Sequence, residues 1–89
     1  MRILTIDDSE TTRAKIKMTF EKFGHQVYEA KSGIHAHDIL RHDSSFDLII
    51  CDMNMPDMDG AQFVKGQDED EVLKKIPIYQ FTSGKVRGK

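Results

Sequence analysis

The sequence predicts an α/β domain built on a parallel β-sheet. Four short apolar runs alternate along the chain with three segments of helical pattern, and short turns join them. This alternation is typical of βαβ units, in which right-handed crossovers connect parallel strands. The 89 residues fit one small domain that spans residues 1–89.

The first strand is predicted at residues 2–6, where a short β-branched run occurs. A helix is predicted over residues 10–23, with Asp8 or Ser9 as its N-cap. Gly24 supplies the stop expected just past a helix end. Three apolar residues at i, i+4 and i+7 define the buried face of this helix: Ile16, Phe20 and Phe23.

The second strand is predicted at residues 26–30, and the second helix at residues 34–41. The expected apolar anchors of that helix are Ile34, Ile39 and Leu40. The third strand is predicted at residues 46–51, an apolar run that ends in Cys51, which we expect to be a buried thiol.

A weaker helix is predicted from Ala61 to about Lys65, because Gly66 costs a helix roughly 1 kcal/mol relative to alanine. The acidic run at residues 68–71 is predicted to be a solvated loop or the first turn of a helix. Pro77 opens the last strand, which is predicted at residues 78–82.

Composition points to a soluble globular protein. Apolar residues make up 38% of the chain and charged residues 31%, and the net charge of −2 gives no reason to expect nucleic acid or a membrane surface as partner. The single cysteine excludes an internal disulfide and favours a reducing compartment. No signal peptide is expected, because Met1 and Arg2 lead straight into a strand pattern, and no apolar stretch of about 20 residues occurs. A cytoplasmic location is therefore expected.

The four histidines are expected to be polar surface positions rather than a metal site. His35 and His37 lie two residues apart on a predicted helix, so they do not share a face.

Carboxylates occur where strands end. Asp7 and Asp8 follow the first strand, Asp52 follows the third, and Thr82 with Ser83 ends the fourth. The carboxyl ends of parallel strands are where open α/β sheets place their chemistry. Two carboxylates about 4 Å apart repel by about 4 kcal/mol at an effective dielectric of ~20, so such a cluster takes up protons or binds a cation. Oxygen-only ligands suit Mg²⁺, and a metal with a carboxylate nucleophile and a hydroxyl fits phosphoryl transfer.

These residues, together with the Met-Pro-Asp-Met-Asp-Gly segment at residues 55–60, give the chain a clear resemblance to receiver domains of two-component response regulators. The resemblance implies that Asp52 accepts the phosphoryl group and that Asp7 and Asp8 hold Mg²⁺ together with Asp52 and the backbone carbonyl of Asn54. It also implies that Thr82 contacts the phosphoryl group as a switch, with Ser83 as a small neighbour that leaves it room.

The family has a flavodoxin-like fold of five strands, and this chain resembles it only through the fourth. The expected fold is therefore a truncated receiver with a four-stranded parallel sheet in the order 2-1-3-4 and helices on both faces. The fourth helix, fifth strand and fifth helix are not matched. Neither are the family's phosphate-binding lysine and its aromatic switch residue. Lys85 lies three residues past Thr82 and does not match that lysine.

A missing helix would uncover apolar sheet area on the order of a few hundred Å², equivalent to roughly 5–10 kcal/mol at ~25 cal/mol per Å². The fourth strand would also be an open edge, which favours pairing with another chain. A homodimer is therefore expected. Gln80, on the same sheet face as Ile78, fits a partly solvated surface better than a covered one.

The resemblance implies a phosphorelay module that takes its phosphoryl group from a histidine kinase or phosphotransfer protein, and that is no enzyme beyond its own phosphorylation. Two alternatives remain open at this point. One is a receiver-derived module that dimerises or binds a protein without being phosphorylated, and the other is a fragment or engineered half-fold.

Overall fold

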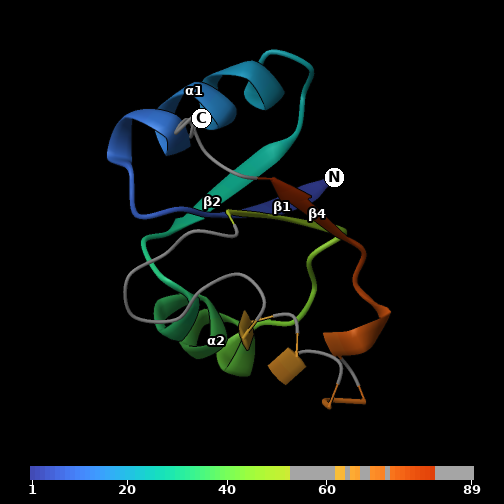
Figure 1. Cartoon of the computed structure of the whole chain (residues 1–89). Helices are drawn as coiled ribbons and strands as arrows, with labels where there is room; N and C mark the ends of the chain where they lie inside the picture. The colour runs from blue at the N-terminus through green and yellow to red at the C-terminus, as the bar shows by residue number, and fades with distance from the viewer. Residues whose placement is uncertain (53–61, 64, 67–68, 72, 82–89) are drawn as a thin grey trace.

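A computed structural model describes residues 1–52, 62–63, 65–66, 69–71 and 73–81 of the chain. These residues form a four-stranded parallel sheet in the predicted order β2-β1-β3-β4, with α1 and α2 on opposite faces (Figure 1). Along the chain the elements are β1 (Arg2–Ile6), α1 (Glu10–Glu21), β2 (Gln26–Ala30), α2 (Gly33–His42), β3 (Leu48–Asp52), the 3₁₀ turn η1 (Leu73–Lys75) and β4 (Ile78–Phe81).

Each face of the sheet carries its own apolar cluster, because successive strand residues point to opposite sides. The larger cluster lies on the α2 face, and its buried members are Leu4, Ile6, Ala30, Ala36, Leu40, Phe46, Ile49, Cys51, Phe63, Leu73 and Ile76. The smaller cluster lies on the α1 face, where Ile16 and Phe20 of the helix pack against Ile3, Val27 and Ile50. The central strands β1 and β3 are therefore covered on both sides.

Helix α1 begins as predicted, with the Ser9 hydroxyl accepting a hydrogen bond from the Thr12 amide at 3.2 Å. Its end was predicted two residues too late. The amides of Phe23 and Gly24 donate to carbonyls three residues back, which tightens the last turn, and Gly24 adopts a φ of 88°. The side chain of Phe23 is 73% exposed, so its predicted place on the buried face was wrong.

Helix α2 begins at Gly33, one residue before the predicted start, because the Ser32 hydroxyl accepts a hydrogen bond from the His35 amide. Ile34 was predicted to anchor the helix, but it is 55% exposed and this prediction was wrong. The other two predicted anchors are confirmed, because Leu40 is buried in the cluster on this face and Ile39 packs against it. Ala36, four residues before Leu40 on the same face, takes the place of Ile34.

Strand β3 runs from Leu48 to Asp52. It was predicted at residues 46–51, so it begins two residues later and ends one residue later than predicted. Phe46 is buried before the strand begins, where its ring packs edge-on against Tyr28 at 5.5 Å. At the other end Asp52 pairs with Phe81 of β4. Asp52 is therefore the last residue of the strand, held by a neighbour, rather than the first residue of the loop. Cys51 is buried, as predicted.

Arg2 makes several contacts at the amino ends of the strands, the edge of the sheet opposite the carboxylates. Its guanidinium forms an ion pair with Asp43 at 2.8 Å and donates to the Ser45 hydroxyl and carbonyl. It also lies over the rings of Tyr28 and Phe46, 4.9 and 4.7 Å from their centroids. The hydrogen bonds from Arg2 and Ser45 hold the pKa of Asp43 well below its usual range. These contacts fix the connection that leads from α2 into β3.

In the segment after β3, residues 62, 63, 65 and 66 are helical, in agreement with the predicted weaker helix. Residues 69–71 are exposed, as expected for a solvated acidic loop, and the Asp70 carboxylate accepts a hydrogen bond from the Leu73 amide at 3.0 Å.

Strand β4 begins after Pro77 as predicted, and Thr82, its predicted last residue, lies outside the described residues. No helix among the described residues is long and apolar enough to span a membrane.

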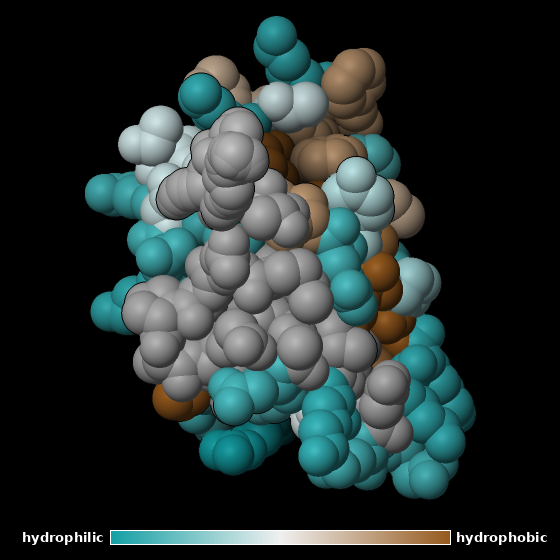
Figure 2. Space-filling model, viewed as in Figure 1, coloured by the Kyte–Doolittle hydropathy of each residue, from teal (hydrophilic) through white to brown (hydrophobic). Residues whose placement is uncertain are grey.

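An apolar groove of about 680 Å³ lies on the α1 face, between the helix and strands β3 and β4. Figure 2 shows apolar side chains, in brown, at the top and along the right side of the molecule, in the region of α1 and β4 in Figure 1. Tyr79 and Gln80 of β4 are exposed, which agrees with the partly solvated surface expected around Gln80. The groove is lined by Thr12, Lys15, Ile16, Phe20, Leu48, Ile50, Tyr79 and Phe81.

His37 is not the exposed polar residue that was predicted. Its ring stacks on Phe63, with 4.7 Å between centroids, and a β-carbon at Gly66 would come within 2.7 Å of its Cε1 atom. Its Nε2 atom is buried and has no hydrogen-bond partner among the described residues. Burial lowers the pKa of His37 and the charge of Arg41 adds to this, whereas the Phe63 backbone and Asp70 act in the opposite direction.

We predict that His37 makes the fold sensitive to mild acid. Because the pKa of His37 is lower in the folded chain, the unfolded chain binds the proton more readily, and stability falls as pH drops below the unfolded value of about 6.5. The His37→Gln variant lacks this titration. Urea unfolding followed by circular dichroism should show wild type losing stability relative to His37→Gln between pH 7.5 and 5.

The matched control is His42→Gln, which removes an exposed histidine of the same helix. Other titrations occur equally in each protein, so they cancel in the comparison. A difference between wild type and His37→Gln that stays constant over this pH range would contradict the prediction.

Candidate metal centre

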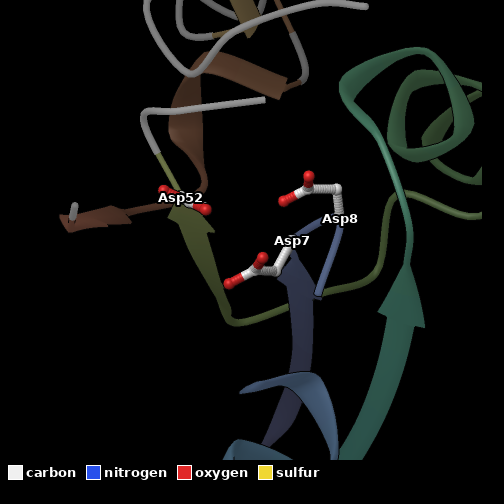
Figure 3. A group of neighbouring side chains, drawn as sticks. All are labelled: Asp7, Asp8 and Asp52. Atoms are coloured by element: carbon white, nitrogen blue, oxygen red, sulfur yellow. The ribbon is translucent and has the colours of Figure 1, made fainter. Parts of the chain in front are cut away.

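Three carboxylates meet at the carboxyl edge of the two central strands (Figure 3). Strands β1 and β3 are parallel neighbours, with Ile6 paired to Cys51, so Asp7 and Asp52 leave adjacent strands at the same level. Asp8 follows directly. One oxygen of each of the three aspartates lies within 4.8 Å of the others. The convergence predicted from the ends of the apolar runs is therefore present.

The three side chains differ in their exposure to water. Asp7 and Asp52 are fully buried, whereas Asp8 is exposed. In Figure 3 the carboxylates of Asp8 and Asp7 extend from the end of β1 toward Asp52 at the end of β3. The site therefore has two buried carboxylates and one carboxylate in contact with solvent.

Asp7 is held in place by its backbone neighbours. Its amide donates to the Ala30 carbonyl of β2 at 3.1 Å, and its Oδ1 atom accepts from the Ser9 amide at 2.8 Å. Ser9 also caps α1, so the same residue starts the helix and orients the carboxylate. The other oxygen, Oδ2, is buried without a hydrogen-bond partner among the described residues.

The electrostatics of Asp7 follow from this placement. Burial raises the pKa of Asp7 from its ordinary value of 3.8 to about 6, and the negative charge of Asp52 adds to the increase. The Ser9 amide opposes the shift because it stabilises the ionised form. The charged cluster is thus unfavourable in the absence of a positive partner.

A divalent cation fits the residues present. Among the described residues the donor set consists of carboxylate oxygens alone, which suits a hard cation such as Mg²⁺. Within the described part of the chain no donor reaches the buried Oδ2 atom of Asp7, and Asp8 is exposed to the water from which Mg²⁺ usually keeps several ligands. The remaining sequence-predicted site residues, Asn54, Thr82 and Ser83, lie outside the described residues.

One contact at the site was not foreseen from the sequence. The guanidinium of Arg13, in the first turns of α1, donates to the Asp7 carbonyl and forms an ion pair with Glu29 of β2 at 2.9 Å. An arginine on a helix ordinarily predicts only a solvated face. One partner follows β1 and the other lies on β2, and the two become neighbours only after folding, so no local pattern could identify this contact.

Comparisons with known proteins agree with this fold. The response regulator receiver domain family matches residues 3–87 of the chain. A chemotaxis protein CheY homolog of Campylobacter jejuni is 37% identical over 84 residues, which cover 93% of this chain and 65% of that protein. CheY1 of Helicobacter pylori is 38% identical over 84 residues, covering 93% of this chain and 68% of the relative. The chain thus spans about two thirds of the length of these relatives.

Solved structures of receiver proteins have the same fold as this chain. CheY4 of Vibrio cholerae superposes with a TM-score of 0.86 at 33% identity, covering 96% of this chain and 70% of that one. The N-terminal domain of a response regulator receiver protein from Methanoculleus marisnigri superposes with a TM-score of 0.87 at 26% identity, covering 97% of this chain and 69% of its own length. The fold, the family match and the relatives agree, and the chain belongs to the response regulator receiver domain family of two-component signalling.

Proposed function

We propose that this receiver accepts a phosphoryl group on Asp52, from the phosphohistidine of a histidine kinase or phosphotransfer protein. The observation that carries the proposal is the cluster of three carboxylate oxygens within 4.8 Å of one another. A carboxylate oxygen of Asp52 attacks phosphorus, the P–N bond breaks, and the imidazole leaves with the bonding electrons. The product is an acyl phosphate on Asp52.

Backbone contacts in the buried part of the site hold Asp52 and Asp7 in fixed positions. As the last residue of β3, Asp52 is fixed by pairing to Phe81, while Asp7 is fixed by Ser9 and Ala30. Exposed Asp8 marks the side from which the donor approaches. Asp7, Asp8, Asp52 and the Asn54 carbonyl would hold Mg²⁺, which supplies positive charge to the phosphoryl oxygens. Thr82 is proposed to contact the phosphoryl group, with Ser83 beside it.

Phosphorylation provides the direct test. Incubation with a small acyl phosphate and Mg²⁺ should add one phosphoryl group to wild type, measured as intact mass, and none to Asp52→Asn. Asp38→Asn, which changes an exposed aspartate of α2, is the control and should react like wild type. If wild type gains no phosphoryl group, or Asp52→Asn gains as much, the proposal is lost. The chain would then be a receiver-derived interaction module.

Metal binding should appear as a change in stability. The folded pKa of Asp7, about 6, exceeds its ordinary value of 3.8, so the folded chain binds the proton more tightly and metal-free stability falls as pH rises from about 4 through 6. At pH 7.5 without metal, Asp7→Asn should be more stable than wild type by about 1–3 kcal/mol. Adding 10 mM Mg²⁺ should stabilise wild type and leave Asp7→Asn nearly unchanged.

Urea unfolding with and without Mg²⁺ measures both effects, and Asp38→Asn should follow wild type in each condition. Equal stabilisation of wild type and Asp7→Asn by Mg²⁺ would count against a metal bound at this site.

We further propose that the chain forms a homodimer through β4 and the apolar groove beside it. Two observations support a second copy as the occupant. β4 lies at the edge of the described sheet, so it offers hydrogen-bonding groups to another strand. The groove continues from this edge, and Tyr79 at its rim is 63% exposed. A two-fold pairing of β4 strands would extend the sheet and bring the two grooves together.

Sedimentation velocity between 5 and 500 μM should show a concentration-dependent dimer for wild type. Tyr79→Lys places a charge at the rim of the groove and should leave a folded monomer. Phe23→Lys is the matched control, because Phe23 is an exposed aromatic residue outside the groove, and it should dimerise like wild type. A wild-type chain that remains a folded monomer at 500 μM would refute the dimer.

A further inference from the structure

We infer that Arg13 is a positioning residue for the acidic site, acting through the backbone of Asp7 and supported by Glu29. The inference rests on the proposed metal site and concerns how that site keeps its geometry. Three contacts carry it: the guanidinium to the Asp7 carbonyl, the guanidinium to Glu29, and the Asp7 amide to the Ala30 carbonyl.

Asp7 lies just beyond the last paired residue of β1. The pairing with β2 ends at Ile6 with Ala30, and the pairing with β3 ends at Ile6 with Cys51. The sheet still supplies a partner for the Asp7 amide, at the Ala30 carbonyl. For the Asp7 carbonyl the partner is the guanidinium of Arg13, which therefore continues the hydrogen bonding of the strand by one step.

This bond fixes the peptide group between Asp7 and Asp8. The carbonyl of Asp7 and the amide of Asp8 belong to one planar unit, so holding the oxygen sets the direction in which the chain continues into Asp8. Asp8 is exposed and has little packing of its own to define it. The distance between the Asp7 and Asp8 carboxylates thus depends on a group six residues further along the chain.

Glu29 keeps the guanidinium in its place. The Arg13 Nε atom lies 2.9 Å from the Glu29 carboxylate, and the two side chains are only 13% and 33% exposed. A planar guanidinium has donors in fixed directions, so one edge can bind Glu29 while another reaches the Asp7 carbonyl. Glu29 also balances the charge of Arg13, which makes the contribution of Arg13 to the site geometric rather than a substitute for the metal's charge.

The chain provides a matched control on the same helix. Lys17 also extends from α1 to a backbone carbonyl of β2, at Val27, over 3.2 Å, and it forms an ion pair with Glu21 on its own helix. Lys17→Ala therefore removes a similar contact between α1 and β2, but one that does not involve Asp7. Any effect that reflects loosening of α1 in general should appear in both variants.

The test is the Mg²⁺ dissociation constant, measured by isothermal titration calorimetry on the full 89-residue chain under conditions where each variant is folded. Removing a group that orients a metal ligand typically weakens binding 10- to 100-fold, so Arg13→Ala should weaken Mg²⁺ binding by about 10-fold. Arg13→Lys and Glu29→Gln should each cause a smaller loss, because one of the two linked contacts remains. Lys17→Ala should bind Mg²⁺ like wild type.

A metal-free readout separates positioning from binding strength. In ¹H–¹⁵N spectra without Mg²⁺, the Asp8 amide should shift in Arg13→Ala and Arg13→Lys but not in Lys17→Ala, because it shares a peptide group with the Asp7 carbonyl. If Arg13→Ala does not fold, Arg13→Lys and Glu29→Gln carry the same test.

The possible outcomes are distinct. Wild-type affinity in Arg13→Ala and Arg13→Lys, or an equal loss in Lys17→Ala, overturns the role of Arg13 and leaves the metal site standing. Absence of Mg²⁺ binding in wild type overturns the proposed metal site, and the inference falls with it. A loss of affinity confined to the Arg13 and Glu29 variants, with the Asp8 shift, supports the inference.

Discussion

The parallel pairing of β1 with β3 is the constraint on which the site depends. Ile6 lies opposite Cys51, so the residues that follow carry carboxylates side by side at one edge of the sheet. Helices cover both faces of these strands, and Asp7 and Asp52 at the strand ends are fully buried. A register shift of one residue would turn the Asp52 side chain to the opposite face and separate the carboxylates.

The two ends of the sheet differ in how their charged side chains are arranged: opposite charges pair at the amino edge, and like charges meet at the carboxyl edge. At the amino edge, Arg2 and Asp43 neutralise each other, and the guanidinium also lies over two aromatic rings. At the carboxyl edge, like charges are brought together, and burial raises the pKa of Asp7 to about 6. The first arrangement stabilises the fold by itself. The second is unfavourable alone, and the proposed cation would offset the repulsion, as expected where stability is exchanged for function.

The two faces of the sheet differ as well. On the α2 face, Phe63, Leu73 and Ile76 join the helix in a large cluster, and His37 is enclosed against Phe63. On the α1 face, one helix packs against a smaller cluster, and an apolar groove remains between it and β4. The proposed self-association concerns this second face because apolar surface there is still accessible to a partner.

The sequence by itself determined the order of strands and helices, the start of the first helix at Asp8 or Ser9, and the three aspartates of the site. These features depend on local periodicity and on where apolar runs end, which a linear pattern records. The exposure of Ile34 and the partial burial of His37 could not be predicted, because each depends on which segment packs against α2. Only the tertiary structure placed the guanidinium of Arg13 on the Asp7 carbonyl, since folding alone brings together its two partners, one just after β1 and the other on β2.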